Sequence, residues 1–110
     1  ETNFIDASAS GNDLETPLGL LTCSTSIPKD TSVCSIRPEA IKVHDTPAAT
    51  NSFSGTCVET IYLGEVAQHQ VELNKNLILR VTEVNPSHLG KLGDTMHLSV
   101  NPKDVVPLSK

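Results

Sequence analysis

Aromatic side chains are almost absent from this sequence of 110 residues, which has two Phe, one Tyr and no Trp. The hydrophobic core must therefore be built from Val, Leu and Ile. Long apolar runs are also missing, and a membrane-spanning helix needs about 20 consecutive apolar residues. The chain starts without a signal-peptide pattern and without Met, its single Met being Met96. We expect a piece of a longer protein that folds as one domain over residues 1–110.

Positive charge is scarce. The sequence has 8 Lys and Arg against 13 Asp and Glu, which gives a formal net charge of −5. A protein that binds phosphate backbones needs clustered basic side chains, and one that binds single strands also stacks the bases on aromatic side chains. We therefore expect no nucleic-acid partner.

Paired cysteine spacings are missing too. Cys23, Cys34 and Cys57 form an odd set without a CxxC pair, whereas a secreted domain usually carries an even number of cysteines. We expect three reduced thiols in a cytosolic setting. The four histidines are too far apart in sequence for a helical metal pair, so no metal site is expected.

Motifs for phosphate binding and for hydrolysis are absent. A P-loop ends in Gly-Lys-Ser/Thr so that backbone N–H groups cradle phosphates, whereas the one Gly-Lys pair, Gly90-Lys91, is followed by Leu92. A serine hydrolase needs a Gly-x-Ser-x-Gly turn, and none occurs. The carboxylates are scattered singly, which is typical of solvated strand faces, although a catalytic carboxylate pair stays an alternative. We expect that this chain is not an enzyme.

The sequence does have the two-residue periodicity of β-strands. Apolar and polar residues alternate over residues 66–73 and again over 77–84, so each segment predicts a strand with one apolar face. Asn74-Lys75-Asn76 lies between them, and Asn tolerates the left-handed backbone of a tight turn. The two strands are therefore predicted to form a hairpin.

Turn signals and β-branched residues predict further short strands. These are Phe4–Ala9, Leu18–Thr22, Thr31–Arg37, Gly55–Leu63, Met96–Val100 and Val105–Leu108. Single helical turns are predicted at 38–41 and 86–90, each with Pro in its first position, and a loop at 44–54. Seven or more short strands predict an all-β fold, a small OB-like barrel or sandwich of antiparallel strands with little helix.

His69 is the one histidine on an apolar strand face. It is a candidate for a pH-sensitive or ligand-contacting imidazole at the mouth of a barrel. The alternative is a half-buried histidine whose hydrogen bonds are satisfied by its neighbours. We favour the second interpretation, because the sequence places no charged partner in view.

Five short motifs occur in the order of one known family and cover nearly the whole chain. They are Thr2–Ile5, Thr16–Gly19, the run Ser35–Glu39 with Arg37-Pro38-Glu39, the stretch Gly55–Val58 with Tyr62-Leu63-Gly64-Glu65, and Gly93-Asp94 with Pro102-Lys103-Asp104. In this order the motifs resemble the transport-associated OB domain, called TOBE. That domain follows the ATPase in maltose-, polyamine- and ferric-type ABC importers.

The resemblance implies a C-terminal regulatory and dimer-supporting domain of an importer's ATP-binding subunit. ATP and Mg²⁺ would belong to an ATPase domain upstream, so no cofactor is expected here. The implied partners are a second copy of the subunit and, through the ATPase domain, the membrane permease subunits, without direct membrane insertion. The implied location is cytoplasmic, peripheral to the inner membrane. The candidate interaction residues of the family motifs are Arg37, Pro38, Glu39, Tyr62, Gly64 and Glu65.

The same residues also have structural interpretations. Pro38 excludes a helical conformation for the residue before it, which leaves Arg37 and Glu39 as opposite charges at a strand end. We expect this pair to hold the strand end against the neighbouring loop, with a docking surface as the alternative. Gly64 allows a barrel strand to kink or bulge.

A related branch of the family binds molybdate through a Ser-Ala-Arg-Asn segment that precedes a Gly-x-Val strand. The corresponding residues here are Ala48-Ala49-Thr50-Asn51 before Gly55. Asn51 and Gly55 match, while the Ser hydroxyl and the Arg are missing, and an oxyanion site loses charge-assisted donors without them. The alternative function is therefore a free-standing domain that binds a molybdate-type oxyanion, with Thr50 and Asn51 as contacts.

Overall fold

The structure, a computed structural model, describes residues 2–74, 76–86 and 92–109. These residues form three antiparallel sheets, and the helical elements among them are two 3-10 turns of three residues each. Neither turn approaches the length of a membrane-spanning helix. The predicted all-β fold of short antiparallel strands is confirmed.

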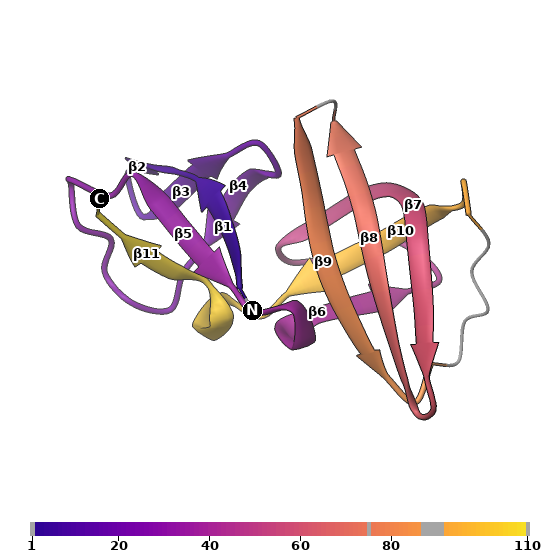
Figure 1. The fold of residues 1–110 in the computed structure, drawn as a ribbon. Coiled ribbons are helices and arrows are strands. Elements are labelled where there is room, and N and C mark those ends of the chain that lie inside the picture. Colours follow the sequence, from indigo (N-terminus) through magenta and orange to yellow (C-terminus); the bar gives the residue numbers. More distant parts are fainter. Residues whose placement is uncertain (1, 75, 87–91, 110) are drawn as a thin grey trace.

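The smaller lobe contains two three-stranded sheets (Figure 1). In the first, β5 (Val33–Ile36) lies between β1 (Asn3–Asp6) and β11 (Val106–Leu108), so the first and last strands flank the same partner. The second is a meander of β2 (Ser8–Ser10), β3 (Asp13–Thr16) and β4 (Gly19–Thr22).

The larger lobe is one sheet that curls into a half-barrel (Figure 1). Its strands in spatial order are β6 (Ile41–His44), β10 (Thr95–Val100), β7 (Ser52–Leu63), β8 (Val66–Asn74) and β9 (Leu77–Val84). The edge strands β6 and β9 approach each other but are not paired, which leaves a seam. The turn η1 (Pro38–Ala40) packs against β9, and η2 (Pro102–Asp104) connects β10 to β11.

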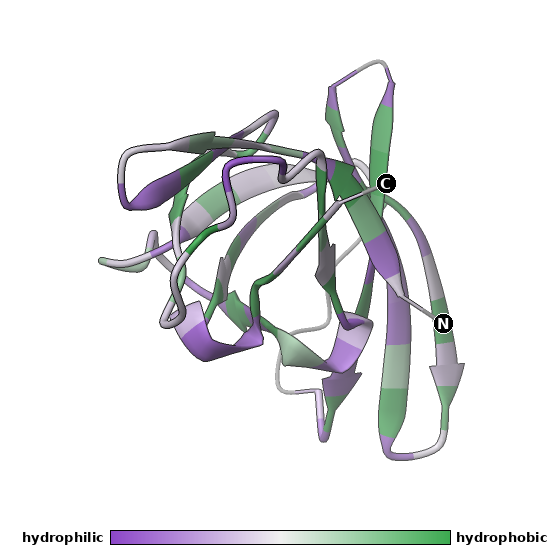
Figure 2. Ribbon diagram, turned by 90° about the vertical axis from the view of Figure 1, so that its left-hand side faces the viewer, coloured by the Kyte–Doolittle hydropathy of each residue, from purple (hydrophilic) through white to green (hydrophobic). Residues whose placement is uncertain are grey.

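The alternation of side chains along each strand determines which residues form the core. Along β8, Ala67, His69 and Val71 are buried, while Gln68 and Glu72 are exposed, and the hydropathy bands in Figure 2 alternate along the strands in the same way. One cluster of buried side chains runs through both lobes, from Ile5 and Cys34 to Leu79 and Leu98. Phe53 is its only aromatic member among the described residues, so the predicted aliphatic core is confirmed.

The predicted hairpin of residues 66–73 and 77–84 is confirmed. Strands β8 and β9 pair from Val66 opposite Val84 to Asn74 opposite Leu77. In the turn, the backbone N–H of Asn76 donates to Oδ1 of Asn74 over 2.9 Å. Lys75 of this turn, and residues 87–90 of the helical turn predicted at 86–90, lie outside the described residues.

The structure differs from the predicted elements in three places. The strand predicted at Phe4–Ala9 is interrupted at Ala7, whose N–H donates to the carbonyl of Ser32. Strand β3 was missed because Leu14 is its only apolar residue, so no alternation is visible. The loop predicted at 44–54 is shorter, since β6 includes His44 and β7 begins at Ser52, which pairs with β10.

Each lobe covers a free strand edge of the other with an asparagine amide. Asn3 donates to the carbonyl of Arg80 on β9 and accepts from its N–H, both over 2.8 Å. Asn51 accepts from the N–H of Thr22 on β4 over 2.8 Å and donates to its carbonyl over 3.0 Å. A side-chain amide carries the same donor and acceptor as a peptide group, so each asparagine substitutes for one residue of an added strand.

Candidate functional site

A groove of about 340 Å³ lies between η1 and the outer face of β7, β8 and β9. Residues directly opposite each other in antiparallel strands share a face, and two such rows cross the three strands. The rows are Glu59, Gln70 and Arg80, and Ile61, Gln68 and Thr82. Pro38 and Glu39 of η1 line the groove beside β9, so it includes two of the predicted motif residues.

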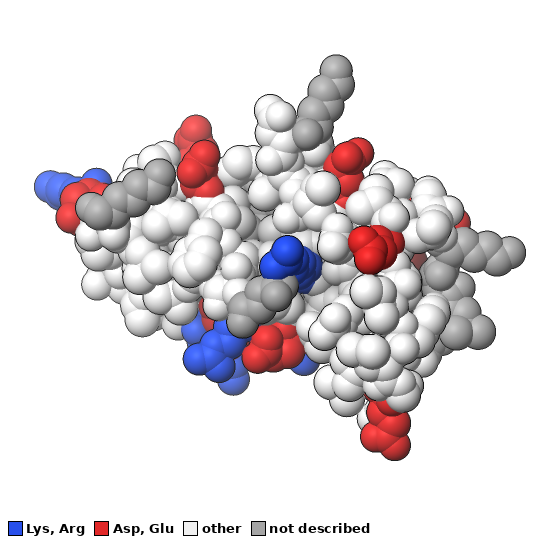
Figure 3. Space-filling view, viewed as in Figure 1, with Lys and Arg blue, Asp and Glu red and all other residues white. Residues whose placement is uncertain are grey.

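The groove is polar and of mixed charge. Glu39 and Glu59 supply carboxylates, Arg80 supplies a guanidinium, and Gln68 and Gln70 supply amides. On the face viewed in Figure 3, acidic and basic side chains lie near one another, and neither sign covers a broad area. Such a lining offers hydrogen bonds of both kinds and suits a polar partner.

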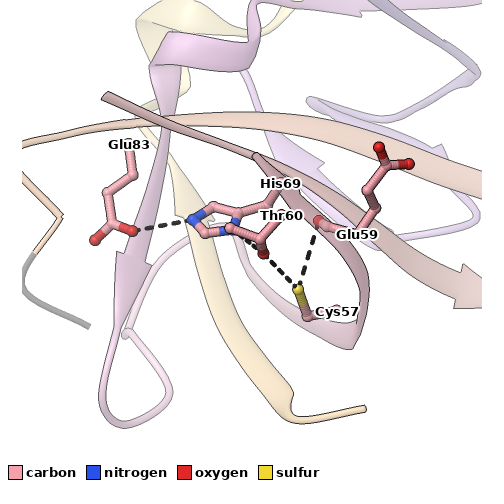
Figure 4. A network of polar contacts seen from close by, with 5 residues as sticks. All are labelled: Cys57, Glu59, Thr60, His69 and Glu83. Carbon is pink, nitrogen blue, oxygen red and sulfur yellow. Dashed lines mark hydrogen bonds and ion pairs between the residues drawn. The ribbon is translucent and has the colours of Figure 1, made fainter. Parts of the chain in front are cut away.

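A chain of hydrogen bonds lies on the inner side of the same strands (Figure 4). Nε2 of His69 lies 3.1 Å from Oε1 of Glu83, and Nδ1 lies 2.9 Å from the hydroxyl of Thr60. That hydroxyl is 3.2 Å from Sγ of Cys57, which is also 3.7 Å from the carbonyl oxygen of Glu59. Cys57 and Glu59 bound a β-bulge in β7, so the chain connects β9 to the bulge.

His69 is nearly closed off from solvent, with 1% of its side chain exposed against 13% for Glu83. Both ring nitrogens have partners, as the favoured sequence interpretation requires, but the premise that no charged group is near was wrong. His69 is opposite Val81, and Glu83 is the diagonal neighbour two residues further along β9. Sequence alone could not place Glu83 there without the register of β8 and β9.

The motif Arg37-Pro38-Glu39 combines one buried residue with two exposed residues. Pro38 is buried against the fold, while Arg37 and Glu39 are both exposed. Within the described chain, no ion pair joins the two charged side chains, and Arg37 contributes only its carbonyl, which accepts from the N–H of Ala40. The structure therefore gives the anchoring role to the proline ring.

Tyr62, Gly64 and Glu65 form the turn region between β7 and β8 and do not line the groove. Gly64 has φ of +70°, a conformation that glycine adopts without the cost of a Cβ. The carbonyl of Glu65 accepts from the N–H of Asn85. Tyr62 is 49% exposed and Leu63 is 55% exposed, so this end of the barrel presents apolar surface.

The two predicted oxyanion contacts differ in accessibility. Thr50 is exposed, whereas Asn51 is buried in a left-handed conformation with φ of +47°. Both ends of the Asn51 amide are engaged by Thr22, and its carbonyl accepts from the N–H of Val100. The amide of Asn51 thus joins the lobes and is not directed at solvent.

The three cysteines are free thiols. Burial raises the pKa of Cys34 to about 11, and the charge of Cys23 contributes in the same direction. Burial and then Asp13 raise the pKa of Cys23 itself. Within residues 2–74, 76–86 and 92–109, no group of three or more potential ligands is placed to hold a metal ion.

Sequence reasoning missed Thr60, Glu83 and the polar row of the groove. The signal was present as polar residues at every second position of 68–70 and 80–82. It becomes a site only when the pairing register places these residues side by side on one face.

The fold is a small all-β domain with a half-barrel and a polar groove, and the comparisons identify its family. Residues 34–108 match the profile of the TOBE domain. Because the match spans most of the chain, the chain belongs to the TOBE domain family, whose members bind rather than catalyse. A search of curated proteins found no match.

Among solved structures, the chain is similar to the cytoplasmic molybdate-binding protein ModG, in a PEG-grown crystal form with molybdate bound. The TM-score is 0.75 at 12% sequence identity, and the similarity covers 100% of this chain and 96% of that chain. At this identity the likeness establishes the fold.

Proposed function

We propose that this chain is a regulatory and dimer-supporting domain of the ATP-binding subunit of an ABC importer. The main supporting observation is the division of the signature: Pro38 is buried, while Arg37 and Glu39 are exposed and form no ion pair with each other. A charged side chain that the fold does not use is available to a protein partner. The ATPase activity would belong to another domain, and the location would be cytoplasmic at the inner membrane.

Exposed apolar residues at one end of the half-barrel support the same proposal. Leu63 is opposite Val66, and Val66 is opposite Val84, so the three form a row across β7, β8 and β9. Leu63 is 55% exposed and Val84 is 63% exposed. Clustered exposed apolar side chains are typical of protein contact surfaces. The partner we propose is a second copy of the subunit.

The test compares Arg37→Ala with Lys29→Ala, an exposed charge elsewhere, in the whole subunit encoded with any upstream sequence. We expect a P-loop and an ABC signature upstream. In transport assays, Arg37→Ala should reduce solute uptake about tenfold with an unchanged melting temperature, a loss of about 1.4 kcal/mol of coupling. An upstream sequence without an ATPase, or unchanged uptake by Arg37→Ala, would refute the proposal.

A second candidate is a domain that binds a molybdate-type oxyanion, and the end-to-end similarity to ModG favours it more directly than it favours the first. The geometry restricts how such an anion could bind. The Asn51 amide is engaged by Thr22, so the donors would be the Thr50 hydroxyl and backbone N–H groups. The net charge of −5 opposes a dianion.

Calorimetric titration with molybdate, tungstate, sulfate and phosphate tests the second candidate. Micromolar binding of molybdate that Thr50→Ala weakens about tenfold, with Thr46→Ala unchanged as the control, would support it. Absence of heat with all four anions at about 1 mM, where even weak binding of about 4 kcal/mol is visible, would exclude it.

A further inference from the structure

We propose that His69 is a buried proton-binding site, and that its protonation reverses the direction of the hydrogen-bond chain leading to the bulge of β7. The inference rests on the four contacts of this chain and is independent of the proposed function. Each group in the chain has a fixed number of protons to donate. Counting these protons gives two arrangements of the hydrogen bonds in which every donor has an acceptor, one for neutral and one for protonated His69.

The position of one proton follows from Glu83. An ionised carboxylate only accepts hydrogen bonds, so Nε2 of His69, which is 3.1 Å from Oε1 of Glu83, carries a proton. In the neutral imidazole the other ring nitrogen, Nδ1, then has no proton and can only accept. The neutral form of His69 is therefore the Nε2–H tautomer.

This tautomer sets the direction of the neutral chain. Because Nδ1 accepts, the hydroxyl of Thr60 donates to it over 2.9 Å. The oxygen of Thr60 is then free to accept, and the S–H of Cys57 donates to it over 3.2 Å. The thiol proton is used there, so the carbonyl oxygen of Glu59 receives none from Cys57.

In the protonated form both ring nitrogens donate. Nδ1–H donates to the oxygen of Thr60, whose own proton turns to Sγ of Cys57. The S–H of Cys57 turns in consequence to the carbonyl oxygen of Glu59, 3.7 Å away. Each donor of the chain has an acceptor in both states, so proton uptake strands no buried polar group.

Charged side chains from several elements surround the pair of His69 and Glu83. Glu83 faces His69 directly, and the other titratable groups lie in the chain or line the cavities on the two sides of the pair. They are Glu39 of η1, Lys42 of β6, Cys57 and Glu59 of β7, and Arg80 of β9. With Glu83 included, three carboxylates and two cations surround the pair.

The chain connects the core to the groove through one residue. Glu59 offers its carbonyl oxygen to the chain, while its carboxylate points away from the network (Figure 4) and lines the groove. A proton on His69 thus changes the hydrogen bonding of a residue that contacts any occupant of the groove. The site couples proton uptake inside the barrel to the backbone of its outer face.

Nuclear magnetic resonance of the ¹⁵N- and ¹³C-labelled chain tests the site. Between about pH 5 and pH 8, where histidine ordinarily titrates, we expect the Nε2–H tautomer at the alkaline end and uptake of a second ring proton at the acidic end. The Cβ signal of Cys57 and the carbonyl signal of Glu59 should shift with the same midpoint as the His69 ring. An Nδ1–H tautomer, or a ring that does not titrate, would overturn the proposal.

Variants of Thr60 test whether Cys57 and Glu59 respond to His69 through the hydrogen bonds or only because they lie near its charge. Thr60→Val removes the hydroxyl at constant shape, and the Cys57 and Glu59 signals should then lose their dependence on the His69 midpoint. Thr60→Ser should restore it, and Thr56→Val, an exposed change on the same strand, should leave it intact. If Thr60→Val does not fold, two measurements still test the proposal. They are the tautomer of His69 in the wild type and the shared midpoint of the three signals in Thr60→Ser. Signals that follow His69 equally well in a folded Thr60→Val would contradict the chain.

Discussion

Asn51 uses both ends of its side-chain amide on the backbone of Thr22, 29 residues earlier in the chain. Asn3 makes the same pair of bonds to Arg80 in the opposite direction, from the smaller lobe to the larger. Both asparagines are buried. At Thr22 on β4 and at Arg80 on β9, the backbone N–H and carbonyl are therefore satisfied by an amide of the other lobe.

The first prediction concerns this bridge. Asn51→Gly keeps the left-handed backbone accessible but removes the amide, which leaves the N–H and carbonyl of Thr22 without partners. We expect the free energy of unfolding to fall by about 1–3 kcal/mol. Asn85→Gly is the control, since Asn85 has a similar φ of +51° and is exposed. Urea unfolding that gives equal losses for both variants would contradict the bridging role.

Arg37→Ala should hardly affect the stability of the domain. The guanidinium is exposed and makes no ion pair with Glu39, and an exposed charge contributes about 0–1 kcal/mol. The expectation that the charged pair holds the strand end is thus replaced by anchoring through Pro38. A fall of more than about 8 °C in the melting temperature of Arg37→Ala, the shift that accompanies a loss above 1 kcal/mol, would restore the earlier interpretation.

Gly55→Ala should destabilise the larger lobe by steric conflict. A Cβ at this position would lie 2.7 Å from the carbonyl oxygen of Glu72 and 2.7 Å from Cγ1 of Val71. Overpacking of this kind costs about 1–3 kcal/mol. Ser54→Ala, on the exposed neighbouring residue, should change the free energy of unfolding by less than about 0.5 kcal/mol. Equal stability of the two variants in urea would show that β7 can move away from β8.

Alkaline pH should destabilise the protein through Cys34. Its pKa rises from 9.0 to about 11 on folding because the thiol is buried, so the unfolded state loses this proton first. The contribution is fully present below pH 9 and is lost as the pH rises to about 11, on the order of 2–3 kcal/mol in total. Cys34→Val should flatten the unfolding free energy over this range. An unchanged slope in the variant would contradict the assignment.

Periodicity predicted the strands that alternate and missed those that do not. The hairpin of β8 and β9 follows from alternating residues and an Asn-containing turn, whereas β3 has Leu14 as its single apolar residue and gives no such signal. Strand β6 follows directly on η1. The alternation of apolar and polar residues in Ile41–His44 is too short to distinguish a strand from a continued turn.

The candidate site was less predictable because it depends on contacts between distant residues. Pro38 and Glu39 were identified from a motif, yet the groove that they line also needs Gln70 and Arg80, which meet only through the register of β7, β8 and β9. Glu83 and Thr60 likewise belong to strands on either side of His69. Register is set by the whole sheet, and local sequence carries little of it.

The position of β5 between β1 and β11 has a consequence for synthesis on the ribosome. Both outer strands pair with β5, but β1 precedes β5 in the sequence, whereas β11 follows only after all the strands of the half-barrel. The half-barrel of β6 to β10 is contiguous in sequence and can assemble while the chain is still growing. Until β11 has been made, one edge of β5 stays unpaired. An unpaired edge can pair with a strand of another chain, so β5 is exposed to aggregation during synthesis.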